Sequence, residues 1–301
     1  MAPKPNPPVD SRADGIDRNA YPFQSRWREL SAGRMHYVDE GAGEVLLFVH
    51  GTPSWSFEWR HLIRALAPRW RCVAPDLIGF GLSERPEGFS YDPEAHAAAL
   101  GEFVERLDCE SLSLIVHDYG GPIGLPICLR QPERVRRLVL FNTWMWSFRG
   151  DRDMEGKARM AGGKLGLFLY RHANLSLRVI TPYAFGDRRK LTPAIHRQYL
   201  DRFPDPTSRG RVLWPLARAI LGSSSYYEAL WAQCERLRGR RALIVWGMRD
   251  PVFQPRQLAR WKEVLPEARV VELTASGHWP QEEEPDRVVG EMQAFLTGSA
   301  S

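Results

Sequence analysis

Asp118, Asp250 and His278 each come just after an apolar run of strand character, and together they are the residues of this chain best suited to catalysis. Asp118 follows such a run at 112–116 and precedes Tyr119, two glycines and a helical pattern. This strand–turn–helix context is typical of a nucleophile elbow, whose central side chain stands out above a sheet. An aspartate there can equally be an ordinary helix N-cap, so the interpretation depends on the companion residues.

The companions of Asp118 lie near the end of the chain. Asp250 comes just past a run at 242–246, and His278 lies in the loop after a run at 269–273. The chain order nucleophile, acid, base is that of α/β hydrolases. Asp250 would fix the imidazole tautomer, and His278 would act as a general base. Asn142, at the end of another run, cannot be the acid because it is an amide. The three positions predict a catalytic triad.

A second segment, His50-Gly51-Thr52-Pro53, follows an apolar run at 45–49. In the hydrolase plan, a loop at this place and the residue after the nucleophile each supply a backbone N–H to an oxyanion hole. Those donors would be Thr52 and Tyr119. The alternative is a plain β-turn at Thr52-Pro53.

The chemistry of an aspartate nucleophile limits the substrate class. A carboxylate that attacks an acyl carbon forms a reactive anhydride, whereas attack on a saturated carbon forms an ordinary ester. Water activated by His278 can then cleave that ester of Asp118. We therefore expect displacement of a leaving group from an sp³ carbon.

Four segments carry a resemblance to haloalkane dehalogenases, with epoxide hydrolases as the next nearest family: HGTP at 50–53, VHDYGG at 116–121, WGMRD at 246–250 and GHWPQEEEP at 277–285. The segment PDLIGFGLS at 75–83 fits the same pattern. The resemblance covers about 21–143 and 226–296. It implies an α/β-hydrolase fold, an Asp–His–Asp triad and an alkyl-enzyme intermediate, and the hydrolysis of a haloalkane to an alcohol and halide.

The chain departs from that family at the donors for the departing halide. Dehalogenases usually have a Trp after the nucleophile and an Asn after His-Gly, or else a Trp in the cap. This chain has Tyr119 and Thr52 at the first two places, and residues 147–212 contain no Trp. We expect other indoles to line the substrate pocket, and the candidates are Trp55, Trp144, Trp146 and Trp279.

Two other functions stay open. An epoxide hydrolase would use the same nucleophile, with the alkoxide protonated by tyrosines; the chain offers Tyr170, Tyr183, Tyr199, Tyr226 and Tyr227. Against this, the residue before His117 is Val116, where epoxide hydrolases more often have Gly. The other alternative is a binding protein that has lost turnover.

Runs of strand character alternate with helical patterns, which predicts βαβ units and a mostly parallel sheet with helices on both faces. The eight predicted strands are 27–30, 35–39, 45–49, 71–74, 112–116, 135–141, 242–246 and 269–273. The first two should pair as an antiparallel hairpin because their connection is short. The predicted helices are 57–67, 93–107, 122–131, 226–236, 256–265 and 285–296.

The alternation stops in an aromatic, helix-like stretch that we interpret as a helical cap, at 144–225. An insertion there would cover the carboxyl edge of the sheet, where such sheets bind ligands. The α/β-hydrolase core then comprises 21–143 and 226–301, and the Pro-rich residues 1–20 are predicted to form a flexible tail.

Composition excludes several classes. The chain has 301 residues, 44% hydrophobic and 26% charged, which suits an ordinary globular protein. It contains no run of about 18 apolar residues for a membrane span and begins without a signal peptide, so we expect a cytoplasmic protein. The net charge of +5 is scattered, and the arginines at 236–241 are interpreted as a solvated turn and not a nucleic-acid site. The cysteines are Cys72, Cys109, Cys128 and Cys234; they lie far apart and predict neither disulfides nor a metal site. The expected partner is a small apolar substrate, without a cofactor.

Overall fold

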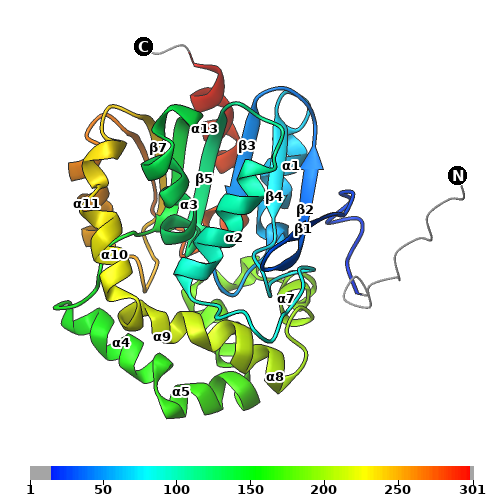
Figure 1. Cartoon of the computed structure of the whole chain (residues 1–301), viewed down its shortest axis with the longest axis vertical. Helices are drawn as coiled ribbons and strands as arrows, with labels where there is room; N and C mark the ends of the chain where they lie inside the picture. The colour runs from blue at the N-terminus through cyan, green and yellow to red at the C-terminus, as the bar shows by residue number, and fades with distance from the viewer. Residues whose placement is uncertain (1–14, 299–301) are drawn as a thin grey trace, which may run out of the picture.

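An eight-stranded sheet runs through the computed structural model, which describes residues 15–298 (Figure 1). Its strand order is β1-β2-β4-β3-β5-β6-β7-β8. β1 pairs antiparallel with β2, and β2 with β4, whereas all other pairs are parallel. The bounds are β1 Arg26–Leu30, β2 Gly33–Glu40, β3 Val45–Val49, β4 Arg71–Pro75, β5 Leu112–Asp118, β6 Val135–Thr143, β7 Arg241–Gly247 and β8 Arg269–Leu273. The predicted mostly parallel sheet and its N-terminal hairpin are confirmed.

Helices cover both faces of this sheet, so every residue of β3 and β5 is buried. In Figure 1, α2 and α3 lie in front of the sheet, and α1 and α13 lie behind it. The predicted helix at 57–67 begins as a 3₁₀ turn, and the one at 226–236 ends early and continues as a second 3₁₀ turn. The core helices are α1 Arg60–Leu66, α2 Pro93–Glu105, α3 Gly120–Arg130, α10 Ser224–Trp231, α11 Pro255–Val264, α12 Pro280–Glu283 and α13 Pro285–Thr297.

Residues 144–225, which we call the cap segment, connect β6 to α10 beyond the carboxyl ends of the parallel strands (Figure 1). Its helices are α4 Arg152–Gly162, α5 Lys164–Phe168, α6 Thr181–Ala184, α7 Pro193–Leu200, α8 Pro206–Ser208 and α9 Trp214–Gly222. Single π-helical turns at Leu169–Ala173, Ser176–Ile180 and Arg209–Leu213 join them. The cap segment is held to the loop that carries His278, whose N–H donates to the carbonyl oxygen of Ala184 at 2.8 Å.

Residues 15–20 belong to the predicted flexible tail, but they are held in place; 1–14 lie outside the described residues. The N–H of Asp17 donates to Gln198 Oε1 at 3.2 Å, and Gln198 Nε2 donates to the carbonyl oxygen of Gly15 at 3.0 Å. Arg64 Nη2 donates to the carbonyl oxygen of Asn19 at 2.9 Å. The partners lie on α7 and α1, far away in sequence, so composition could not reveal these contacts.

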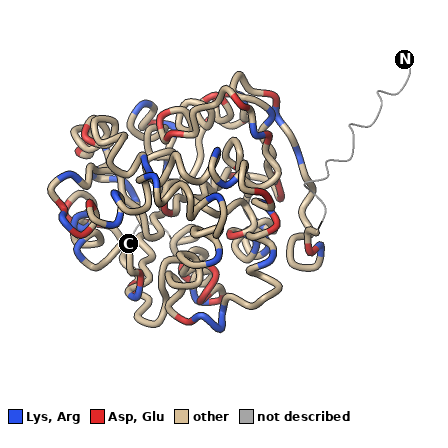
Figure 2. The backbone as a smooth tube through the Cα atoms, turned by 90° about the horizontal axis from the view of Figure 1, so that it is seen from below, with Lys and Arg blue, Asp and Glu red and all other residues tan. Residues whose placement is uncertain are grey.

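Charged residues of both signs are interspersed over the face shown in Figure 2. Three of the arginines near 240 serve the fold, because Arg236, Arg240 and Arg241 donate to backbone carbonyl oxygens. Within residues 15–298, no helix has the length and apolar character needed to cross a membrane.

Candidate active site

Asp118 lies where β5 ends and α3 begins, beside the carboxyl end of β3. The chain places β4 on one side of β3 and β5 on the other, and open parallel sheets bind ligands in the crevice at such a reversal. The φ of Asp118 is 51°, a strained left-handed conformation for a residue with a side chain. A Cβ on Gly120 would lie 2.2 Å from the carbonyl oxygen of Val49, so this turn requires glycine there. Strain and close packing of this kind are features of a nucleophile elbow.

Two backbone N–H groups hold one side of the Asp118 carboxylate. The N–H of Thr52 donates to Asp118 Oδ1 at 2.9 Å, and the N–H of Tyr119 also hydrogen-bonds this carboxylate. The donors come from the two loops that the sequence predicts for an oxyanion hole. The Asp118 carboxylate is therefore held by two fixed backbone dipoles, and the one from Thr52 points at Oδ1.

The other carboxylate oxygen faces an imidazole. Asp118 Oδ2 lies 3.6 Å from His278 Nε2, which is too long for a direct hydrogen bond. His278 Nδ1 lies 2.7 Å from Asp250 Oδ2. The structure thus brings the three residues of the predicted triad together, in the order Asp118, His278, Asp250.

The charges of these residues are strongly coupled. Burial disfavours the imidazolium of His278, but Asp250 and its hydrogen bond outweigh burial, with help from Asp118 and Glu58, and raise the pKa of His278 to about 9. Burial would raise the pKa of Asp250, yet the charge and hydrogen bond of His278 lower it. For Asp118 burial prevails and raises the pKa despite His278 and the backbone donors. At neutral pH, His278 is therefore charged in the resting site.

Asn142 holds Asp250, the acid of the proposed triad, through a hydrogen bond. Its Nδ2 donates to Asp250 Oδ2 at 2.9 Å and to the carbonyl oxygen of Gly247 at 3.1 Å, while its Oδ1 accepts from the N–H of Gly247 at 2.8 Å. Asn142 has a φ of 20°, so β6 ends in a strained turn that directs its amide at β7. Its amide thus holds Asp250 and the end of β7 in one arrangement.

A second buried histidine–carboxylate pair lies beside the triad and was not expected from the sequence. His117 Nδ1 lies 3.2 Å from Glu58 Oε1, and His117 Nε2 lies 2.8 Å from the carbonyl oxygen of His278. Ser54, from the Thr52 loop, donates to Glu58. The one available signal was an acid within the aromatic stretch 55–59.

A cavity of about 360 Å³ leads from Asp118 to the surface of the cap segment. Phe253 and Trp279 line it from the α/β core. The cap segment contributes Trp144, Met154, Met160, Tyr170, Ile180 and Tyr183. The size and mainly apolar lining of the cavity are typical of small-molecule sites.

Of the four indoles predicted for the pocket, Trp144 and Trp279 line this cavity and the other two do not. Trp55 stacks on Phe57 in the core, and Trp146 packs edge-on against Trp231. The prediction was wrong for Trp55 and Trp146 for the same reason: a residue that lies near a motif along the chain can still point its side chain into the core.

Three buried polar groups of the cavity lining have no hydrogen-bond partner among the described residues: Trp144 Nε1, Trp279 Nε1 and Thr52 Oγ1. Tyr119, in contrast, uses its hydroxyl to donate to the carbonyl oxygen of Leu216 in α9 at 2.5 Å. Tyr119 stands where dehalogenases usually have a Trp, but its hydroxyl already donates to the cap segment and does not donate to a ligand.

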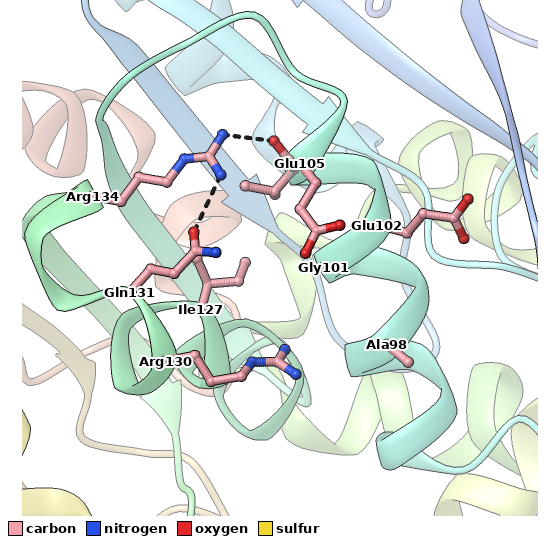
Figure 3. Close-up of a pocket in the computed structure, with 9 residues that line it drawn as sticks. Ala98, Gly101, Glu102, Glu105, Ile127, Arg130, Gln131 and Arg134 are labelled. Atoms are coloured by element: carbon pink, nitrogen blue, oxygen red, sulfur yellow. Dashed lines mark hydrogen bonds between the residues drawn. The ribbon is translucent and has the colours of Figure 1, made fainter.

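A second hollow, of about 270 Å³, lies between α2 and α3 (Figure 3). Arg134 there donates to the carbonyl oxygen of Val104 at 2.8 Å and to Gln131 Oε1 at 3.2 Å. Its guanidinium thus joins the elements that form the hollow. None of the residues lining it lines the Asp118 cavity. Residues 15–298 contain no group of three His, Cys, Asp or Glu side chains placed to hold a metal ion.

Comparison with known proteins identifies the family. The profile of the α/β hydrolase fold matches residues 44–285. Haloalkane dehalogenase 2 of Mycobacterium tuberculosis is 36% identical over 274 residues, 90% of this chain and 94% of the relative. A cis-3-alkyl-4-alkyloxetan-2-one decarboxylase of Shewanella oneidensis is 31% identical over 284 residues, 92% of this chain and 89% of the relative. The structure of an epoxide hydrolase from Bacillus megaterium superimposes with a TM-score of 0.74 at 28% identity, covering 91% of this chain and all of that chain. This chain belongs to the α/β hydrolase fold family, among the hydrolases related to haloalkane dehalogenases.

Proposed function

We propose that this hydrolase acts on a saturated carbon through an ester of Asp118, as a haloalkane dehalogenase does, and converts a haloalkane and water into an alcohol and halide. The observation that carries the proposal is that the two oxygens of the Asp118 carboxylate have different surroundings. One oxygen is held by the N–H of Thr52, and the other faces His278.

In the first step, Oδ2 of Asp118 attacks the carbon that bears the halogen. The new C–O bond forms as the carbon–halogen bond breaks, and the halide leaves with the bonding electrons. Oδ1 becomes the carbonyl oxygen of the ester while it stays bound to the N–H of Thr52. No proton has to move in this step.

In the second step, water attacks the carbonyl carbon of the ester. Once His278 has released its resting proton to solvent, it takes a proton from the water, and Asp250 stabilises the imidazolium that results. The Thr52 and Tyr119 N–H groups stabilise the charge that develops on Oδ1. Collapse of the tetrahedral intermediate breaks the bond to the alkyl oxygen, which takes the proton from the His278 imidazolium and leaves as the alcohol. The Asp118 carboxyl group then releases its proton to solvent, which restores the carboxylate.

The departing halide needs donors, and Trp144 is the best placed. Its Nε1 is buried, has no partner among the described residues and belongs to the lining of the same cavity as Asp118. The ring is fixed edge-on against Tyr119 and stacked on Phe253. Thr52 Oγ1 is a second unpartnered group of that lining.

The test is to trap the ester. With His278→Phe and 1-bromohexane, mass spectrometry of peptides should show a hexyl group on Asp118 and release of one bromide per protein. His278→Phe combined with Asp118→Asn should stay unmodified. An unmodified Asp118 in a variant that still turns over the substrate would exclude this mechanism.

Epoxide hydrolysis is the second candidate, and Tyr170 favours it. This tyrosine of the cap segment lines the cavity, and burial raises its pKa to about 12, so it keeps its proton at neutral pH. The Tyr170 hydroxyl pairs with that of Ser176, and in the epoxide reaction Tyr170 would donate its proton to the ring oxygen. Three other predicted tyrosines already donate to protein atoms: Tyr199, Tyr226 and Tyr227.

A substrate panel separates these functions. Bromide release from 1-bromohexane supports dehalogenation, and diol formation from styrene oxide supports epoxide opening. A cis-3,4-dialkyloxetan-2-one tests the chemistry named for the Shewanella relative. Tyr170→Phe should impair the epoxide reaction alone, because a departing halide requires no proton. Tight binding without any product would instead favour a binding protein.

A further inference from the structure

The exposed large hydrophobic side chains of residues 15–298 fall in one part of the cap segment, and two of them line the cavity that contains Asp118. All five large hydrophobic side chains that are exposed among residues 15–298 fall within 160–183 of the cap segment: Met160, Leu165, Phe168, Val179 and Tyr183. Exposed apolar side chains are normally scattered singly over a protein, and a cluster marks a site of interaction. This cluster therefore requires an explanation.

Two members of the cluster connect the surface to the nucleophile. Met160 on α4 and Tyr183 on α6 are 65% and 61% exposed, yet both line the cavity that contains Asp118, which is 7% exposed. Ile180 lines the cavity next to Tyr183. We call Met160, Ile180 and Tyr183 the apolar rim.

The path from Asp118 to the apolar rim offers little to a polar ligand. The charged residues of the lining are Asp118, His278 and Lys157. The Lys157 ammonium lies 3.0 Å from Asp153 Oδ2 and donates to the carbonyl oxygen of Pro251 at 3.0 Å, so its charge is already satisfied. Met154, Phe148 and Ala161 supply apolar contacts along the way. A chain of methylenes fits this lining better than any polar group.

We propose that the substrate carries a long alkyl chain, whose reactive carbon lies at Asp118 and whose remaining methylenes leave the cavity across the apolar rim. The proposal rests on the function proposed above only in placing the reactive carbon at Asp118. It explains why apolar surface is exposed at the rim, because the chain would cover it during binding.

The test measures binding without turnover. Primary alcohols, which belong to the product class, are titrated into the wild-type protein by calorimetry in a series from about C4 to about C12. Each fully buried methylene contributes about 0.8 kcal/mol, so affinity should rise about fourfold per carbon within the cavity. Across the half-exposed rim it should continue to rise by roughly twofold per carbon. A plateau once the cavity is filled would overturn the proposal.

Substitutions test the rim itself. Met160→Gln and Tyr183→Gln should weaken binding increasingly with chain length, by roughly tenfold for the longest alcohols if about four methylenes lose their contacts. Leu165→Gln is the matched control, because Leu165 has the same 65% exposure as Met160 but does not line the cavity. An equal loss with Leu165→Gln would show that general surface hydrophobicity, and not a path for the chain, sets the affinity.

Two further measurements separate the possible failures. Bromide release from bromoalkanes that carry a terminal ethylene glycol group tests turnover over the same lengths. Length-dependent alcohol binding without bromide release would retain the chain site and reject dehalogenation. Flotation with phosphatidylcholine vesicles tests whether the cluster is a lipid-binding surface. If Met160→Gln and Leu165→Gln lose vesicle binding equally, and alcohol affinity reaches a plateau, the cluster binds lipid and the alkyl-chain proposal is rejected.

Discussion

Glu58 and His117 form a buried pair, with 3.2 Å between Glu58 Oε1 and His117 Nδ1. The other nitrogen of this ring hydrogen-bonds the carbonyl oxygen of His278, so the position of the proposed base depends on a carboxylate that does not touch it. Ser54 extends the link to the loop of Thr52. The loops of the proposed base and of the oxyanion donors thus share one polar network.

Replacing Glu58 should disturb both the position and the protonation of His278. Glu58→Gln keeps the size but removes a charge that helps to raise the pKa of His278. We expect kcat to fall roughly tenfold, by about 1.4 kcal/mol, as for a lost charged hydrogen bond. The pH midpoint of ester hydrolysis should move to lower pH. Glu155→Gln, on the surface of α4, is the control. A lower kcat with an unmoved midpoint would indicate a structural role alone.

The two proposed steps should respond differently to pH. Alkylation needs ionised Asp118. Because the pKa of Asp118 is raised, the rate of alkylation should begin to fall at a higher pH than for an ordinary aspartate, and it should not change at more alkaline pH. Hydrolysis needs neutral His278. Esterification removes the Asp118 charge, so the pKa of His278 in the intermediate should lie below the resting value of about 9. The rate of hydrolysis should rise with pH until the pH exceeds this lowered pKa. Rapid-quench measurements of bromide and alcohol separate the steps. Parallel profiles would contradict the assignment.

Protein stability should fall on the alkaline side. The pKa of His278 is about 9 in the folded protein against 6.5 in the unfolded chain, so its stabilising contribution is complete below pH 6.5 and is lost as pH rises through 9. The loss should be on the order of 3 kcal/mol in the free energy of unfolding. Urea unfolding at several pH values measures it. His278→Phe should remove this pH dependence, and a wild-type curve that is already flat there would refute the coupling.

Trp144 should matter for halide departure. Trp144→Phe preserves an aromatic ring but removes the unpartnered N–H of the cavity lining. Loss of a preorganised donor costs about 10²-fold in rate, so single-turnover bromide release should fall by that order. Trp55→Phe is a matched control, because its indole N–H also lacks a partner but lies outside the lining. Equal effects of the two substitutions would point to packing in place of a donor.

Arg60 should be important for stability rather than for catalysis. Its guanidinium forms a buried bidentate ion pair with Glu282, which also accepts from Tyr199 of the cap segment. Arg60→Met leaves a buried carboxylate without its cation and should lower the free energy of unfolding by about 3–5 kcal/mol. Arg159→Met, which breaks the exposed pair with Glu155, should cost less than about 1 kcal/mol. Chemical denaturation compares them; similar losses would be inconsistent with this ranking.

Local apolar patterns were sufficient to predict the sheet, and the order of the segments along the chain was sufficient to group Asp118, Asp250 and His278. The strands were visible because β3 is apolar throughout and is followed by His50, and β5 is mainly apolar up to Val116 and ends at Asp118. Asp118, Asp250 and His278 could be grouped because the carboxyl ends of parallel strands meet at one edge. Chain order alone carried that information.

Side-chain direction and distant pairing could not be predicted in this way. Trp55 and Trp144 both lie near motifs, but only the folded chain shows that Trp144 faces the cavity. Glu58 looked like one acid among aromatic residues until the fold brought His117 beside it. Gln198 is separated by 181 positions from its partner Asp17, so no local pattern could predict that hydrogen bond.

The bond between the N–H of His278 and the carbonyl oxygen of Ala184 bears on how this enzyme could be recombined with its relatives. Glu283 strengthens the same junction by accepting from the N–H groups of Gly277 at 2.7 Å and Asp187 at 2.9 Å. A Cβ on Gly277 would approach the carbonyl oxygen of Ala184 to 2.2 Å. A chimaera that carries the cap segment of a relative would keep the His278 imidazole in position only if it retained these backbone contacts. Substrate specificity is therefore best transferred by exchanging other parts of the cap segment.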